Sequence, residues 1–440
     1  MDIREILHKV TAMFRTTVNI FYVNKAQLIK VHIHPEENYT DLQNYINEQT
    51  DVWPENQILL FKSNLFTNIV RENSKARSYP EATEEEPLFL FDKANNNVTV
   101  ILEQSLPKFS KFSNVISIEI DTAQARNAYN TGVKWTKQIE KYSLSCRHFI
   151  NCVENFVQYI NKELKEVKQF CDCLLEKNTI LKMTTYFLES SQCLASFRLN
   201  NIPPITYVDE LKKLSEYFIS QTVQKIRQLN RSYVIDNTLQ SEWDTSSHLL
   251  KCPVKSRASE RARTEVQRLR DSWQCMLRIN YKHSLSHNDQ QFHILERIKI
   301  TNTFNRVNML LQKEVVPQYV QLAENLGDWY KSAQIVYLQL TILKMDVLDY
   351  EDKLKKFEFE MFIKNEQYLE KVRNSLERDA TDKSSKKMHN SNNEQLKKSL
   401  SEYNRKSVQI NDIILERAQI LEQVNRTLEE LTIEETRLSL

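Results

Sequence analysis

The segment WTKQIEKYSLSCRHFINCVENFVQYINKELKEVKQFCDCL, residues 135–174, decides the fold of most of this chain. It contains neither proline nor glycine. Its apolar side chains recur mostly every three or four residues, the spacing of one face of an α-helix. That series comprises Trp135, Ile139, Tyr142, Cys146, Phe149, Val153, Phe156, Ile160, Leu164, Val167 and Leu174. The pattern predicts a long helix whose apolar and aromatic face packs against other helices.

This helix is predicted to be far longer than the quoted segment. No proline occurs between Pro107 and Pro203, and Asp121 or Thr122 is suited to start a helix. At about 1.5 Å per residue, a helix filling most of that span exceeds about 100 Å. Residues 115–120 (VISIEI) are rich in β-branched side chains and predict a short strand before it. The Pro203-Pro204 pair predicts the corner that ends it.

Two more long helices are predicted after that corner. One spans about Val208 to Trp243 and the other runs from about Ser259 to beyond Glu370, with a kink at Pro317. Only two glycines occur among 440 residues, so few turns of positive φ can be built. The composition therefore predicts a mainly α protein.

The N-terminal hundred residues carry a different pattern. Four short runs rich in β-branched and aromatic residues predict strands, and a polar helix between the second and third is predicted to begin at Thr40 or Asp41 and to end near Thr50. The runs are Val18–Val23, Leu28–Ile33, Ile58–Phe61 and Leu88–Phe91. The order β-β-α-β-β is typical of the ubiquitin-like β-grasp fold.

The C-terminal segment shows a heptad repeat. Its apolar positions are Leu396, Leu400, Tyr403, Ile410, Ile414, Leu421, Val424, Leu428, Leu431 and Leu438. Such a repeat predicts a coiled coil. The charged residues Arg417 and Glu435 interrupt its apolar seam and favour pairing with a specific partner or in a specific register. Capture of an adaptor protein, self-pairing and folding back on the helices are all compatible with it. Residues 379–393 lack periodicity and predict a flexible linker.

The overall composition restricts the class of protein. The 60 basic and 58 acidic residues nearly cancel, which does not favour nucleic acid as a partner. No run approaches the roughly 18 apolar residues of a membrane span, and no signal-peptide pattern occurs at the N-terminus. Seven scattered cysteines without CxxC spacing predict reduced thiols. We expect a cytoplasmic protein without a membrane span, cofactor or metal site.

Several residue groups could suggest other chemistry, but each has a simpler explanation. His248, Cys252 and Cys275 lack the paired spacing of a zinc site, and His283 and His287 lack the HExxH order. Cys171 and Cys173 are interpreted as helix residues on different faces. A basic cluster comprises Lys255, Arg257, Arg261, Arg263, Arg268 and Arg270. It is interpreted as a solvated helix face or as a binding site for an acidic protein surface.

An ordered set of short motifs carries a family resemblance. The motifs are Ile6-Leu7-His8-Lys9, residues 56–61 (NQILLF), residues 79–89 (YPEATEEEPLF), Ser105-Leu106-Pro107-Lys108, Thr131-Gly132-Val133, residues 287–293 (HNDQQFH) and Ile414-Leu415-Glu416-Arg417. Their order and spacing resemble the part of TANK-binding kinase and IκB kinase epsilon, the IKK-related kinases, that follows the kinase domain. The resemblance spans essentially the whole chain.

The resemblance implies a modular fold: a small ubiquitin-like domain, an elongated long-helix scaffold and a C-terminal coiled coil. We therefore expect a connector helix at 1–14, a ubiquitin-like domain at 15–94, a scaffold dimerisation domain at 105–378, the linker at 379–393 and an adaptor-binding coiled coil at 394–440. It also implies a homodimer, adaptor proteins as partners and contact with the kinase domain of the parent enzyme, in innate immune or NF-κB-type signalling.

The resemblance also assigns roles to individual residues. Leu59 and Leu60 match a hydrophobic patch that contacts the scaffold and supports kinase activity, and strand alternation places them on opposite faces. Lys108 matches a ubiquitination site. The adaptor-binding helix is matched by Val408, Asp412, Leu415 and Leu421. The family's glycine after the patch strand is absent here, and Asp412 replaces an asparagine.

The chain carries no kinase motif of its own. Two glycines cannot form a glycine-rich phosphate loop, and neither HRD nor DFG occurs. We expect the non-catalytic regulatory part of a serine/threonine kinase. The alternative is a stand-alone adaptor that competes for or organises the same partners, and the transcript upstream of Met1 would distinguish the two.

Overall fold

A computed structural model of the chain describes residues 16–71, 73–100, 102, 109, 111–113, 115–198, 203–247, 257–281 and 286–384. These residues form two compact units. The first comprises the described residues up to Thr185 and from Tyr207 to Glu358, and the second comprises those from Tyr186 to Thr206 and from Phe359 onward. None of the described helices is long and apolar enough to cross a membrane.

The N-terminal part of the first unit is the predicted ubiquitin-like β-grasp. Its strands are β1 (Thr16–Tyr22), β2 (Gln27–Ile33), β3 (Gln57–Phe61), β4 (Asn64–Leu65) and β5 (Leu88–Asp92). They form one sheet in the order β2-β1-β5-β3-β4, in which β1 and β5 are parallel and the other neighbours antiparallel. The four predicted strands are confirmed; the two-residue β4 and the helical turn α3 (Phe66–Ile69) were not predicted.

Helix α2 (Tyr39–Thr50) covers one face of this sheet. Leu42 and Ile46 of α2 are fully buried in a single core with Ile20, Val31 and Leu90. The predicted end at Thr50 is right, but the predicted cap is wrong: Asn38 is the N-cap, and it forms a capping box with Asp41. The Asn38 carboxamide accepts from the Asp41 amide at 3.2 Å, and the Asp41 carboxylate accepts from the Asn38 amide at 2.9 Å.

The quoted segment lies in the single helix α4 (Ile118–Arg198), as predicted. The predicted strand at 115–120 is wrong, because α4 already begins at Ile118. Its first turn carries Glu119 and Asp121, whose negative charges are favourable at a helix N-terminus.

The second predicted helix is interrupted. It consists of α5 (Val208–Tyr217), the π-helical turn Phe218–Thr222, α6 (Val223–Leu229) and a second π-helical turn, Asn230–Ile235. After Asn237, which has a φ of 48°, α7 (Thr238–Ser247) follows. Single π-helical turns leave no clear signature in hydrophobic periodicity, so the sequence suggested one continuous helix.

The third predicted helix is three helices and a π-helical turn: α8 (Ala258–Asn280), α9 (His287–Met309), the turn Leu310–Val315 and α10 (Val316–Ser384). Helix α9 starts anew with its own N-cap, Ser286, which forms a capping box with Asp289. Pro317 is the second residue of α10 and follows the π-helical turn by two positions. Helix α10 continues to Ser384, six residues into the predicted linker at 379–393, because adding residues to an existing helix costs far less than starting one.

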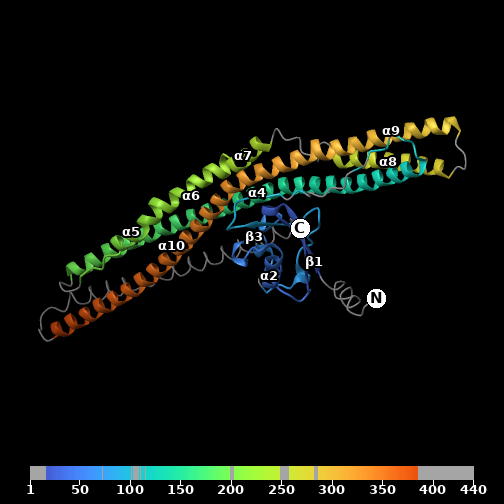
Figure 1. Cartoon of the computed structure of the whole chain (residues 1–440). Helices are drawn as coiled ribbons and strands as arrows, with labels where there is room; N and C mark the ends of the chain where they lie inside the picture. Colours follow the sequence, from blue (N-terminus) through green and yellow to red (C-terminus); the bar gives the residue numbers. More distant parts are fainter. Residues whose placement is uncertain are drawn as a thin grey trace. The chain divides into compact units, whose positions relative to one another are not determined.

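The helices of the first unit pack through the predicted aromatic face. Figure 1 shows α8 and α9 beside the N-terminal half of α4, and the rings of Trp135 and Phe304 lie 4.5 Å apart. Tyr129 stacks on Trp273 of α8 at 5.6 Å. Gly132 permits this approach, because a Cβ there would lie 2.9 Å from the Leu269 side chain. The predicted packing role of the aromatic series is confirmed.

The second unit has its own polar anchor. The Gln192 side chain accepts a hydrogen bond from the Ile205 amide at 2.9 Å, and the Gln192 carbonyl accepts one from the Tyr368 hydroxyl at 3.0 Å. Gln192 therefore holds the end of α4, the following corner and α10 together within this unit.

Candidate functional site

The second face of the sheet docks on the helices. Phe21 of β1 and Phe91 of β5 are fully buried, although neither belongs to the core beneath α2. The Phe21 ring lies 5.8 Å from that of Phe149 on α4. The Phe91 ring lies 4.9 Å from Phe156 of α4 and 5.1 Å from Tyr330 of α10. The site is thus an aromatic interface between the ubiquitin-like domain and two scaffold helices.

Leu59 and Leu60 lie on opposite faces of the sheet. Leu59 belongs to the core beneath α2, whereas Leu60 does not and is nevertheless fully buried. Leu60 pairs across the ladder with Phe89, whose ring lies 6.3 Å from His148 of α4. Leu60 is therefore on the docking face, and Leu59 stabilises the small domain from within.

Hydrogen bonds surround the aromatic interface. In the β3–β4 turn, the Ser63 amide donates to the Asn155 side chain at 2.6 Å and the Ser63 hydroxyl to that of Gln158 at 2.6 Å. Lys62 and Ser63 both have positive φ, 45° and 62°. Glycine would adopt this turn without strain, so the bonds to α4 offset the strain of the two larger residues.

The end of β5 is bound to α10. The Tyr330 hydroxyl donates to the Asp92 carbonyl at 3.0 Å, and the Gln334 side chain donates to the Lys93 carbonyl at 2.8 Å. Burial and the nearby Asp92 carboxylate raise the pKa of the Tyr330 hydroxyl well above its usual value, so it remains a donor. Arg147 of α4 forms an ion pair with Glu85 of the acidic loop, residues 84–86 before β5.

His148 is a buried titratable group inside this interface. Its ring lies 4.8 Å from that of Phe21, and neither ring nitrogen makes a hydrogen bond of ordinary geometry. Burial, assisted by the positive charge of Arg147 and opposed weakly by the backbone at Glu84, lowers the pKa of His148 to about 4. The docked domain therefore requires a neutral imidazole.

Acidification is expected to weaken this docking through His148. Because the folded-state pKa lies below the unfolded value of about 6.5, the unfolded chain binds the proton first and stability falls as the pH drops from about 6.5 to 4. Between pH 7 and pH 5 this single group should cost about 2 kcal/mol. Urea unfolding at both pH values measures it; His148→Phe should reduce the pH-dependent loss by that amount, and an equal loss in both proteins would contradict the assignment.

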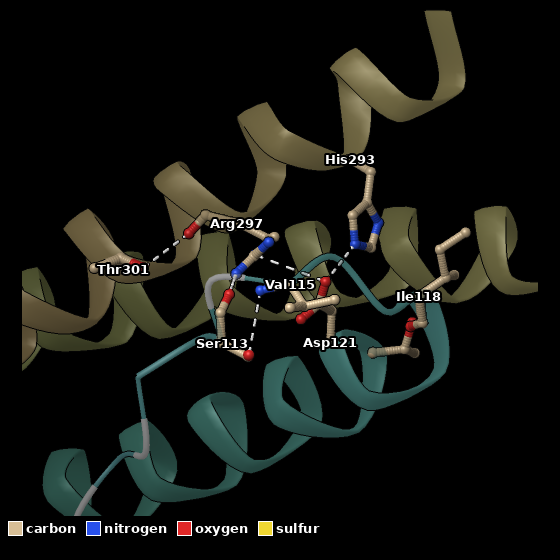
Figure 2. Close-up of polar contacts among 8 residues, drawn as sticks. Ser113, Val115, Ile118, Asp121, His293, Arg297 and Thr301 are labelled. Carbon is tan, nitrogen blue, oxygen red and sulfur yellow. Dashed lines mark hydrogen bonds and ion pairs between the residues drawn. The ribbon is translucent and has the colours of Figure 1, made fainter. Parts of the chain in front are cut away.

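A second buried polar group joins the start of α4 to α9. Asp121 is fully buried, and its carboxylate lies 2.9 Å from Nε2 of His293, which is 1% exposed. Because an ionised carboxylate only accepts, Nε2 carries the proton and donates. Figure 2 shows His293 and Arg297 reaching from α9 toward Asp121, and the Arg297 guanidinium also donates to the Ser113 carbonyl.

The sequence did not predict this Asp121–His293–Arg297 cluster. Asp121 was considered only as a helix start, and His293 only as part of a motif. The two are 172 positions apart, so no local spacing connects them. The one available signal was the i, i+4 spacing of His293 and Arg297, which places both on one face of α9.

The basic residues of α8 mostly have acidic neighbours. Arg261 forms an ion pair with Glu314, Arg263 with Glu140 of α4, and Arg268 with Glu265. Lys255 lies outside the described residues. Cys171 is buried and Cys173 exposed, as predicted. Within the described ranges, no three His, Cys, Asp or Glu side chains are placed to hold a metal ion.

Several predicted sites lie outside the described residues: the connector helix at 1–14, Lys108, the remainder of the linker, the coiled coil at 394–440 and, in it, Val408, Asp412, Leu415 and Leu421. His248, Cys252 and His283 also lie outside them. These assignments stay predictions.

Two family models match the chain, and they divide it where the structure changes from sheet to helices. The TANK binding kinase 1 ubiquitin-like domain matches residues 15–103. The TANK-binding kinase 1 coiled-coil domain 1 matches residues 110–367, more than half of the chain. Both describe non-catalytic domains. The chain therefore belongs to the TANK-binding kinase 1 family, of which it carries the ubiquitin-like domain and helical coiled-coil region that follow the kinase domain.

Proposed function

We propose that this regulatory and scaffold part brings two copies together, positions a kinase domain and recruits adaptor proteins. The observation that supports the pairing is an apolar stripe on α10. Ile335, Ile342 and Met345 are 55%, 62% and 64% exposed, and the half-buried Leu338 completes a heptad spacing with them. Such a row of exposed apolar residues is costly in water and is suited to pair with a second copy.

The docked ubiquitin-like domain supports the positioning role. Its sheet face is occupied by α4 and α10, so the domain is attached to the scaffold by an aromatic interface and by hydrogen bonds at its edges. In this proposal, Leu60 contributes to the docking face, and Leu59 contributes to the core on the opposite side of the sheet. Pairing two such scaffolds would raise the effective concentration of one kinase domain near another and favour activation in trans.

The adaptor role rests on the C-terminal heptads and on the family resemblance. We place it at 394–440, with Val408, Asp412, Leu415 and Leu421 on the binding helix and Lys108 as a ubiquitination site. Signalling of the innate immune or NF-κB type in the cytoplasm, through a homodimer, is part of the same proposal. It needs no cofactor, metal or nucleic acid.

The pairing is tested by light scattering on the purified chain. We expect a dimer at micromolar concentration and a monomer after Ile342→Asp with Met345→Asp, because two carboxylates per copy would be buried without partners. Deletion of residues 393–440 should leave the dimer intact while it abolishes adaptor pull-down.

A matched control uses the exposed Ile298 of α9. Ile298→Asp makes the same chemical change away from the stripe and should leave the dimer unchanged. A monomeric wild-type chain, or a dimer that is lost only in Ile298→Asp or in the deletion variant, would contradict the proposed arrangement.

A further inference from the structure

One exposed face of α4 carries three basic residues over several turns. Between Thr122 and Ile139 the helix contains no acidic residue, and Arg126, Lys134 and Lys137 are all exposed. At about 100° per residue, Lys134 and Lys137 lie only about 80° and 20° around the helix from Arg126, so the three share a face. The residues between them on this face are the exposed Asn127 and Asn130 and the half-buried Val133.

This face continues directly into the docking site of the ubiquitin-like domain. By the same rotation, His148 and Asn155 lie about 40° and 20° from Arg126. Both contact the domain, and Arg147 beside them binds the acidic loop through Glu85. The C-terminal end of the face thus already holds an acidic segment of this chain, whereas its N-terminal part contacts no domain in the described structure.

Helix α8 adds a further cation beside this face of α4. Arg263 reaches Glu140 of α4 at 2.6 Å, so this side of α8 flanks the exposed face of α4. Arg270 follows seven residues later on the same side and is exposed. Arg261 and Arg268, in contrast, lie on the side of α8 toward α9 and pair with Glu314 and Glu265. No ion pair involves Arg126, Lys134, Lys137 or Arg270 among the described residues.

We propose that Arg126, Lys134, Lys137 and Arg270, the basic face, bind an acidic polypeptide segment whose carboxylate or phosphorylated side chains match these four cations. The face spans about 17 Å along α4, the length of about five residues of an extended chain. A phosphorylated segment would supply the same chemistry as one rich in aspartate and glutamate.

The composition of the basic face favours a polypeptide over other anions. A membrane-binding helix inserts large exposed apolar side chains between its cations, whereas the apolar side chain among the cations of this face is the half-buried Val133. Single-stranded nucleic acid is held by exposed aromatic stacking platforms, whereas the half-buried Tyr129 ring is already stacked on the ring of Trp273. Duplex DNA, with one charge per about 1.7 Å, is contacted by a longer basic track.

The test uses the full chain and a fluorescein-labelled dodecapeptide of alternating glutamate and serine, with and without phosphorylated serines. Fluorescence anisotropy should show binding by at least one form. Lys134→Glu with Lys137→Glu should weaken it at least tenfold, and raising the salt concentration should weaken it in the wild type. Whether both forms bind, or only the phosphorylated one, identifies the source of the negative charge.

The matched control reverses two exposed lysines farther along α4, Lys165→Glu with Lys182→Glu. It changes the net charge equally and should alter binding less than twofold. Thermal melting should be unchanged in both double variants, because all four side chains are exposed. Equal weakening in the control, absence of binding by either peptide, or stronger Lys134-dependent binding of a 20-base-pair duplex or of phosphatidylserine vesicles would overturn the proposal.

Discussion

Replacing Asp121 by alanine is expected to lower the free energy of unfolding of the first unit by about 3–5 kcal/mol. The carboxylate is fully buried, and it is the partner of both His293 and Arg297. Removing one member of a buried ionic group leaves the others desolvated without compensation, and this costs more than the lost hydrogen bond. The measurement is equilibrium urea unfolding followed by tryptophan fluorescence, because Trp135 and Trp273 report on this part of the scaffold.

The matched control for Asp121 is Asp209, an exposed aspartate in the first turn of α5. Asp209→Ala removes the same charge near a helix N-terminus and should cost only about 0.3–1 kcal/mol. The double variant Asp121→Ala with His293→Ala should be less destabilised than the sum of the single variants, because neither change then leaves the other group unpaired. Strict additivity would show that the two side chains do not interact.

Local periodicity predicted the helices and strands well because it depends on near neighbours. The three- and four-residue steps from Trp135 to Leu174 predicted the buried face of α4, and the β-rich runs predicted four strands. The break between α8 and α9 was missed, although Ser286 and Asp289 have the spacing of a capping box. That local signal is present in the sequence.

The sequence of β5 carries a signal for the docking face. The run Leu88–Phe91 is apolar at every position rather than alternating, and all four residues are buried. A strand with one solvated face alternates, whereas a strand covered on both faces does not. The pattern of β5 therefore indicates that a second layer covers the sheet. That α4 and α10 form this layer could not be predicted, because Phe91 and Tyr330 are far apart in sequence.

Phe91→Ala is expected to weaken the docking of the ubiquitin-like domain by about 3–5 kcal/mol. The ring is fully buried between Phe156 of α4 and Tyr330 of α10, so its loss leaves a cavity in the centre of the interface. Hydrogen exchange measured by mass spectrometry can locate the effect. Peptides covering residues 148–158 of α4 should lose protection, while α2 and its core should keep theirs.

The neighbouring residue supplies the control. Leu90 is equally buried but faces the core beneath α2. Leu90→Ala should cost a comparable amount, about 2–5 kcal/mol, yet it should lower protection in α2 rather than in residues 148–158. Substitutions of two adjacent residues on one strand would then weaken two different layers, the interface with α4 and the core beneath α2, as strand alternation requires. If both variants lost protection uniformly across the sheet, α2 and α4, the domain and the scaffold would unfold as one cooperative unit, and a separate docking step would be ruled out.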